Sequence, residues 1–205
     1  AQMTLEFLVT TLIVVVSPGA GALYTIAAGL ARGSKASLWA ALFCTLGIVP
    51  HMIAAITGLA AILHTSALAF EIIKYLGVAY LLYMAWATLK ETGALSVPTD
   101  PAPKSLKDMC IEVVLMNLLN PKLSIFFFAF LPQFVPTDAP GAIPQMLQLS
   151  GIFMLMTFVV FALYGLFAAA IRNQVVSRPA IMTWMRRTFA AAFVALGAKL
   201  ALTQQ

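Results

Sequence analysis

Two short stretches of the chain place helix-breaking and polar residues inside long apolar runs. They read SPGAG at residues 17–21 and NLLNPK at residues 117–122. Proline has no N–H, and its ring clashes with the carbonyl group four residues earlier in a helix. Pro18 is therefore expected to free the carbonyl group of Val14. Pro121 is expected to free the carbonyl group of Asn117. Each stretch should therefore interrupt a helix.

The ends of interrupted helices can bind charged groups. Exposed N–H groups at a helix start favour a carboxylate, whereas freed carbonyl groups favour an ammonium or another cation. Glycine beside a break also allows close approach of the backbone. An amino acid carries both a carboxylate and an ammonium group. The two stretches therefore predict a site for a small zwitterion, formed by Ser17, Pro18, Gly19, Gly21, Asn117, Asn120, Pro121 and Lys122.

The composition indicates that these stretches lie in a membrane. Of the 205 residues, 62% are hydrophobic and 9% are charged, and the mean hydropathy is +0.97. Soluble domains are nearer ~45–50% apolar and ~25% charged, and a soluble fold cannot hide so much apolar surface. The net charge of +5 is scattered between apolar runs and does not indicate nucleic-acid binding. Cys44 and Cys110 form no CxxC motif, so neither a disulfide framework nor a thiol relay is expected.

Six segments are long and apolar enough to cross a bilayer as helices, which takes about 20 residues. The expected fold is one all-α transmembrane domain over residues 1–205. Residues 105–110 and 179–187 are expected to lie along the cytoplasmic surface. A cleavable signal peptide is not expected at the start, because a basic region is missing and Pro18 occupies the cleavage position. The six predicted spans are residues 5–28, 36–63, 67–89, 111–134, 143–171 and 187–202.

The lysines and arginines predict the orientation, because basic residues favour cytoplasmic loops. The second and fourth connections between spans contain no lysine or arginine. The odd-numbered connections are therefore expected to be cytoplasmic, with both termini periplasmic. Nine basic residues lie in these odd-numbered connections: Arg32, Lys35, Lys90, Lys104, Lys107, Arg172, Arg178, Arg186 and Arg187.

The cytoplasmic linker over about residues 90–110 contains three prolines and divides the chain into halves of three spans, about residues 5–89 and 111–202. An odd number of spans makes the second half enter the membrane from the opposite side, as in an inverted-topology repeat. Spans one and four, the first of each half, are the two that contain the breaks. Interrupted spans in corresponding positions indicate the binding site of a transporter.

Lys122 is expected near the centre of span four. A lysine there costs about 2.5–3.5 kcal/mol on insertion scales, so it must face the protein interior or reach the interface. One interpretation is a positive charge that faces a substrate carboxylate. The alternative is a structural cation held by the freed carbonyl groups of a neighbouring break.

Two further residues of the spans are candidates for chemistry. His51 lies near the centre of span two and has an unperturbed pKa of about 6.5, so it is a candidate for carrying a coupling proton. Its alternative role is that of a hydrogen-bonded packing residue. Tyr164 in span five can offer a hydroxyl group to the cavity. Gly21, Thr25 and Gly29 form a stripe of small residues that predicts close helix packing.

Four stretches resemble the LysE/Rht family of bacterial amino-acid exporters. The most specific one is Asn-Pro-Lys followed by a phenylalanine-rich run and Leu-Pro-Gln-Phe. The resemblance implies proton-driven export of amino acids or related metabolites, such as homoserine, threonine-like compounds or other zwitterions, across the bacterial inner membrane, as a dimer. The four stretches occur in family order over nearly the whole chain: SPGAGALYTIAAGLARGSKASL, KYLGVAYLLYMAWATLK, NLLNPKLSIFFFAFLPQFV and RTFAAAFVALGAKLAL.

The resemblance also implies roles for particular residues. Ser17, Pro18 and Gly19 match the first family motif, and Asn117, Asn120, Pro121 and Lys122 match the second. His51 matches a histidine that is common in the second span. The family usually continues the first motif with Pro-Asn or Pro-Asp, whereas Ala20 and Gly21 follow here. A polar side chain beside the first break is therefore missing, which affects the substrate and any acidic coupling group.

Other functions are weighed against the same residues. A metal-ion exporter of the same superfamily would need a cluster of histidine, cysteine or carboxylate ligands. His51 and Cys44 alone are too few ligands to favour such a site. A non-transporting scaffold subunit would not explain two interrupted spans in matching positions. An enzyme is not expected, because HExxH, GxSxG and paired mid-membrane carboxylates are missing. The expected partners are a small-molecule substrate, protons, the lipid bilayer and a second copy of the chain, with no cofactor and no nucleic acid.

Overall fold

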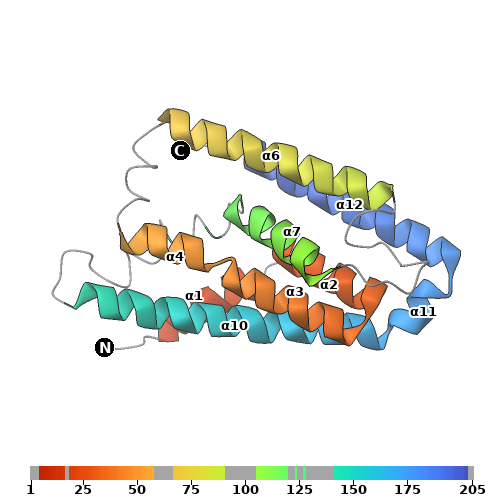
Figure 1. Cartoon of the computed structure of the whole chain (residues 1–205), viewed down its shortest axis with the longest axis horizontal. Coiled ribbons are helices and arrows are strands. Elements are labelled where there is room, and N and C mark those ends of the chain that lie inside the picture. Colours follow the sequence, from red (N-terminus) through yellow and green to blue (C-terminus); the bar gives the residue numbers. More distant parts are fainter. Residues whose placement is uncertain are drawn as a thin grey trace.

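The computed structural model of the chain is a bundle of helices (Figure 1). It describes residues 5–16, 19–57, 67–90, 105–119, 123, 127 and 141–202. Within these ranges every regular element is a helix, as the predicted all-α class requires. The helices are α1 (Leu5–Val16), α2 (Ala20–Arg32), α3 (Ser34–Leu46), α4 (Val49–Ile56), α6 (Ala67–Leu89), α7 (Leu106–Leu118), α10 (Ala142–Ala170), α11 (Arg172–Val176) and α12 (Pro179–Ala201).

Two described stretches are long and apolar enough to cross a membrane, Ser34–Ile56 (α3 with α4) and Ile143–Ala170 (α10). The pair α1 and α2 forms a third candidate, and its two helices are bent by 54° relative to each other. The predicted interruption of the first span therefore has a counterpart in the fold. Residues 58–63 and most of residues 120–134, which complete the predicted second and fourth spans, lie outside the described residues. The count of six spans therefore stays a prediction.

The helix boundaries agree with the predicted span at α6 and differ most at the starts of α7 and α12. Helix α6 has the predicted bounds. Helix α7 begins at Leu106, because the Ser105 side chain accepts a hydrogen bond from the N–H of Asp108 (3.1 Å) and caps the first turn. Helix α12 begins at Pro179, a residue suited to a first helical position, where no N–H is needed. Residues 105–110 and 179–187 therefore form the starts of longer helices, and their position along the cytoplasmic surface stays a prediction.

Corresponding helices of the two halves pack against each other. Helix α3 contacts α10 and α6 contacts α12. Figure 1 shows that α6 and α12 run in opposite directions, and so do α3 and α10. A two-fold axis in the membrane plane would place corresponding helices side by side and make them run in opposite directions. The arrangement supports the predicted inverted repeat, which stays a prediction.

Small residues allow α2, α3 and α10 to approach closely. A Cβ atom added at Gly29 would lie 2.4 Å from the carbonyl oxygen of Gly165, and one added at Gly165 would lie 2.5 Å from Cβ of Ser37. The hydroxyl group of Thr25 donates to the carbonyl oxygen of Gly21 (2.9 Å), so it is satisfied within its own helix. The small-residue stripe therefore packs helices together, as its spacing predicted.

Basic residues gather at one end of the bundle. The α2–α3 junction, the end of α6 and α11 lie at the same end in Figure 1, whereas α1 begins and α12 ends at the other. Arg172 Nη2 donates to the carbonyl oxygen of Ala31 (3.0 Å), which ties the first and fifth connections together. We refer to this end as the basic end. Its position on the cytoplasmic side stays a prediction.

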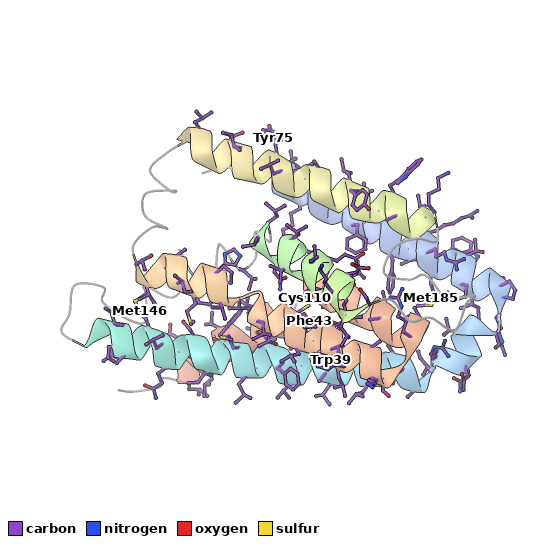
Figure 2. The ribbon with its side chains drawn as sticks, viewed as in Figure 1. Trp39, Phe43, Tyr75, Cys110, Met146 and Met185 are labelled. Atoms are coloured by element: carbon purple, nitrogen blue, oxygen red, sulfur yellow. The ribbon has the colours of Figure 1, made fainter. Side chains whose placement is uncertain are left out.

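Helix α6 presents aromatic side chains to the surroundings of the bundle. Tyr75, labelled on α6 in Figure 2, is 57% exposed, and Trp86 is 60% exposed. The Nζ atom of Lys90 lies 4.8 Å from the centre of the Trp86 ring at the basic end. Amphipathic rings and lysines are typical of a membrane interface. These aromatic residues therefore belong to the outer surface and not to a substrate site.

Candidate functional site

A small, partly open cavity of about 20 Å³ lies inside the bundle. Val15 lines it from α1, and Gly19, Gly21 and Ala22 line it from the start of α2. Asn117 of α7 and Leu123 line it from the second predicted break. The fold thus brings three of the predicted site residues, Gly19, Gly21 and Asn117, to one cavity, although they are almost 100 positions apart in the sequence.

The first break presents a helix start to this cavity. Helix α1 ends at Val16 and α2 begins at Ala20, with Gly19 in an extended conformation that makes no side-chain cap. The first N–H groups of a helix have no partner within it, so this end carries a partial positive charge. Because Gly19, Gly21 and Ala22 all line the cavity, an anionic group placed there would meet the start of α2.

Tyr164 stabilises the other side of the same break. Its hydroxyl group donates to the carbonyl oxygen of Val16, 2.9 Å away, at the end of α1. The last carbonyl groups of a helix lack donors within the helix, so this contact caps α1. The sequence placed Tyr164 in the cavity, but it is not among the described residues that line it. Its position fits a role in holding α1 against α10.

Asn117 on α7 is 2% exposed and fits into the bend between α3 and α4. Its Nδ2 atom donates to the carbonyl oxygen of Cys44 (2.8 Å). That carbonyl lacks its usual helical donor, since the N–H of Ile48 bonds to Thr45 instead (3.1 Å). A Cβ atom at Gly47 would lie 2.6 Å from Asn117 Nδ2. The bend therefore needs a glycine at position 47 to admit the amide.

His51, in α4, completes this arrangement. Its Nε2 atom lies 2.7 Å from the carbonyl oxygen of Asn117. A carbonyl oxygen can only accept, so Nε2 carries a proton and donates it. Pro121 has no N–H to offer this carbonyl, which the sequence predicted to be freed. His51 is 6% exposed and supplies the donor that the helix lacks. This geometry gives His51 a packing role, and its proposed proton role stays a prediction.

Five predicted site residues lie outside the described residues: Ser17, Pro18, Asn120, Pro121 and Lys122. Leu123, which directly follows Lys122, is described, is 5% exposed and lines the cavity. The chain therefore passes the cavity next to Lys122. The two interpretations of Lys122, a charge for the substrate or a structural cation, both remain predictions.

Sequence reasoning missed seven lining residues. Val15, Ala22 and Leu123 lie beside the predicted breaks, and the other four are Cys44, Ile48, Thr157 and Phe161. A signal existed for Cys44 and Ile48, because Gly47 and Pro50 interrupt the second span in the sequence. No signal in the long apolar helix α10 distinguished Thr157 and Phe161 from their neighbours. Only the packing of α10 against α2 and α3 turns them toward the cavity.

A carboxylate also lies closer to the cavity than the sequence indicated. The hydroxyl group of Tyr24, a residue 1% exposed on α2, donates to Oε2 of Glu112 on α7 (2.6 Å). Glu112 precedes Asn117 by five residues, or about 7.5 Å along a helix. This hydrogen bond joins α2 and α7 between the cavity and the basic end. No pattern in the sequence pointed to this contact.

The described residues offer little for binding a metal ion. Within the described ranges, no group of three or more histidine, cysteine, aspartate or glutamate residues could hold one. Cys44 and Cys110 are both free thiols, the first buried beside the cavity and the second on α7 (Figure 2). The class of substrate therefore stays a prediction.

Comparisons with known proteins identify the family of the chain. The profile of the family described as LysE type translocator matches residues 12–204. An uncharacterized membrane protein of Vibrio cholerae is 32% identical, covering 96% of this chain and 95% of that protein. A homoserine/homoserine lactone efflux protein of Salmonella typhimurium is 28% identical, and the match covers 95% of this chain and 94% of that protein. A leucine efflux protein of Enterobacter is 28% identical, and the match covers 76% of this chain and 77% of that protein. No solved structure matches the chain.

Proposed function

The chain belongs to the LysE type translocator family, and from this premise we propose that it is a secondary transporter that exports amino acids or related small metabolites. We place it in the bacterial inner membrane, as a homodimer with periplasmic termini. The names of its relatives include homoserine, homoserine lactone and leucine as exported compounds. These compounds are small and share an α-amino group, which agrees with a site for one small molecule between two helix breaks.

The observation that carries this proposal is the position of the cavity at the start of α2. Gly19, Gly21 and Ala22 line it, and they belong to the first turn of a helix, whose N–H groups favour a carboxylate. We assign the substrate carboxylate to this helix start, with Lys122 as a second positive group from the other break. Asn117, held by two hydrogen bonds, forms the opposite wall. Such a site needs no cofactor.

Export requires the site to open in turn to each side of the membrane. The Tyr24–Glu112 hydrogen bond holds α2 against α7 on the side of the basic end. We assign this contact to the cytoplasmic gate, which must open to admit substrate from the cytoplasm. The opposing pairs α3–α10 and α6–α12 supply the surfaces on which one half can move relative to the other.

We further propose that export is coupled to protons and that His51 carries the coupling proton. The hydrogen bond to Asn117 requires a proton on Nε2. A second proton would bind at Nδ1 and would leave that hydrogen bond in place. His51 can therefore change its charge without losing the contact that holds Asn117 at the cavity wall.

Liposomes that contain the purified protein test the proposed function. They would be loaded with a panel of labelled amino acids, and release would be followed with and without a pH gradient. We expect release of at least one neutral amino acid above the rate of protein-free liposomes, and faster release with the gradient. Release of Zn²⁺ or Mn²⁺ without release of any amino acid would favour the metal-ion exporter. Release of neither would favour the scaffold subunit.

A further inference from the structure

The walls of the cavity are mostly apolar where the structure describes them. Val15, Ile48, Leu123 and Phe161 contribute apolar side chains, and no described lining residue carries a charge. The two described polar side chains with nitrogen or oxygen atoms each already donate a hydrogen bond to the protein. Thr157 donates to the carbonyl oxygen of Phe153 (2.8 Å), and the Asn117 amide donates to Cys44. A charged or strongly polar group placed against this wall would lose much of its hydration and would gain few partners in return.

Phe161 and Gly21 are complementary across the cavity. A Cβ atom added at Gly21 would lie 3.0 Å from Cε2 of Phe161 and 3.5 Å from Sγ of Cys44. The ring of Phe161, which is 6% exposed, thus occupies the space into which a side chain at position 21 would extend. A side chain at position 21 would press against this ring, which would have to shift. Phe161 over Gly21 therefore contributes to the apolar wall together with Val15, Ile48 and Leu123.

We infer that Phe161, packed over Gly21, selects substrates with a neutral, aliphatic side chain and disfavours those with a polar or charged one. This inference rests on the proposed function, because it assumes an amino acid bound with its carboxylate at the start of α2. The aliphatic group then lies against Phe161, Ile48 and Leu123, which line the same cavity. Leucine and norvaline fit this class, whereas homoserine and lysine do not.

Two nearly isosteric substrates make the inference measurable. Norvaline and homoserine differ by a methyl group in place of a hydroxyl group at the end of the side chain. A hydrophobic pocket discriminates against an added hydroxyl group by up to about 100-fold. We expect the protein to release norvaline about 10- to 100-fold faster than homoserine from liposomes loaded with equal amounts of both, and to release lysine no faster than protein-free liposomes do.

Substitutions at the pair should change this ratio. Phe161→Ala removes the ring, and the double variant Phe161→Ala with Gly21→Asn places an amide in the vacated space. We expect the double variant to lower the norvaline-to-homoserine ratio at least about 10-fold, since homoserine gains a hydrogen-bonding partner. Phe158→Ala, on the same helix and packed against the core, is the matched control and should leave the ratio unchanged.

The outcomes separate this inference from the proposed function. A wild-type preference for homoserine or lysine would overturn the inference while leaving amino-acid export intact, and so would an equal effect of Phe161→Ala on every substrate. Failure of the wild type to release any amino acid would overturn the proposed function itself. Thermal unfolding of the wild type with norvaline or homoserine provides a measurement that needs no variant. A larger rise in melting temperature with norvaline supports the inference, and an equal or smaller rise contradicts it.

Discussion

His51 Nε2 donates a hydrogen bond to the carbonyl oxygen of Asn117, with 2.7 Å between the two atoms. The two residues are 66 positions apart and belong to different halves of the chain. Asn117 in turn donates to Cys44 on the other side of the α3–α4 bend. These two hydrogen bonds therefore join the α3–α4 bend in the first half of the chain to the end of α7 in the second half, at the cavity wall. Disturbing any member of this group should affect both stability and export.

Gly47→Ala tests the space that Asn117 occupies. The new Cβ atom would lie 2.6 Å from Nδ2 and 2.9 Å from Cβ of Asn117, so the amide must move. Overpacking of this kind typically costs about 1–3 kcal/mol. We expect a lower melting temperature in detergent and slower export. Gly151→Ala is the control, because nothing lies within 4 Å of a Cβ atom at that position. Equal melting temperatures for the two variants would contradict the packing described for Asn117.

His51→Gln tests the proposed coupling proton. Glutamine retains an N–H donor for the Asn117 carbonyl but does not titrate near neutral pH. We expect the variant to fold with a melting temperature close to that of the wild type, to release substrate down its own gradient and to lose acceleration by a pH gradient. Release that still accelerates with the pH gradient would leave His51 as a packing residue alone.

Lys122→Met distinguishes the two interpretations of Lys122. Methionine keeps the apolar stem and removes the charge. If Lys122 faces the substrate carboxylate, the variant should insert normally and lose export. The export of amidated substrates should then fall less than the export of free acids. Lower folded yield, with all substrates affected equally, would indicate a structural cation. Normal yield with normal export would exclude both roles. Lys107→Met, on the exposed start of α7, is the control.

Tyr24→Phe tests the proposed cytoplasmic gate. The variant keeps the ring and removes the hydrogen bond to Glu112. A hydrogen bond to a charged group contributes about 1.5–3 kcal/mol, so its loss should favour the open gate by about tenfold or more. In a Cys110→Ser background, alkylation of Cys44 by a thiol reagent added on the cytoplasmic side should become faster by that factor. Tyr83→Phe, on the exposed face of α6, should leave the rate unchanged.

Single cysteines test the predicted orientation. In a background without Cys44 and Cys110, cysteines at Ser34 and Thr183 should be protected from an impermeant thiol reagent added on the periplasmic side. A cysteine at Asp138, in the predicted fourth connection, should be labelled. The reverse pattern would show that the protein is inverted relative to the prediction from its basic residues.

Local chemistry allowed much of the architecture to be determined from the sequence. The absence of an N–H in proline is a property of one residue, so the break between α1 and α2 near Pro18 and the end of α7 before Pro121 were predictable. Apolar length alone predicted α6 with its bounds and α10 within a residue at each end. The starts of α7 and α12 were missed, because a serine cap and a proline in the first turn extend a helix beyond its apolar part.

The partners of the freed groups were decided only by the tertiary structure. The sequence predicted that the Asn117 carbonyl would lack a donor, but only the packing of α4 against α7 brings His51 to it. Tyr164 reaches the end of α1 across 148 positions, and Phe161 fills the space over Gly21 because Gly29 and Gly165 let α2 and α10 approach closely. The residues of a segment determine where its helix is interrupted. The side chain that donates a hydrogen bond to the freed carbonyl group depends on which distant helix packs beside it.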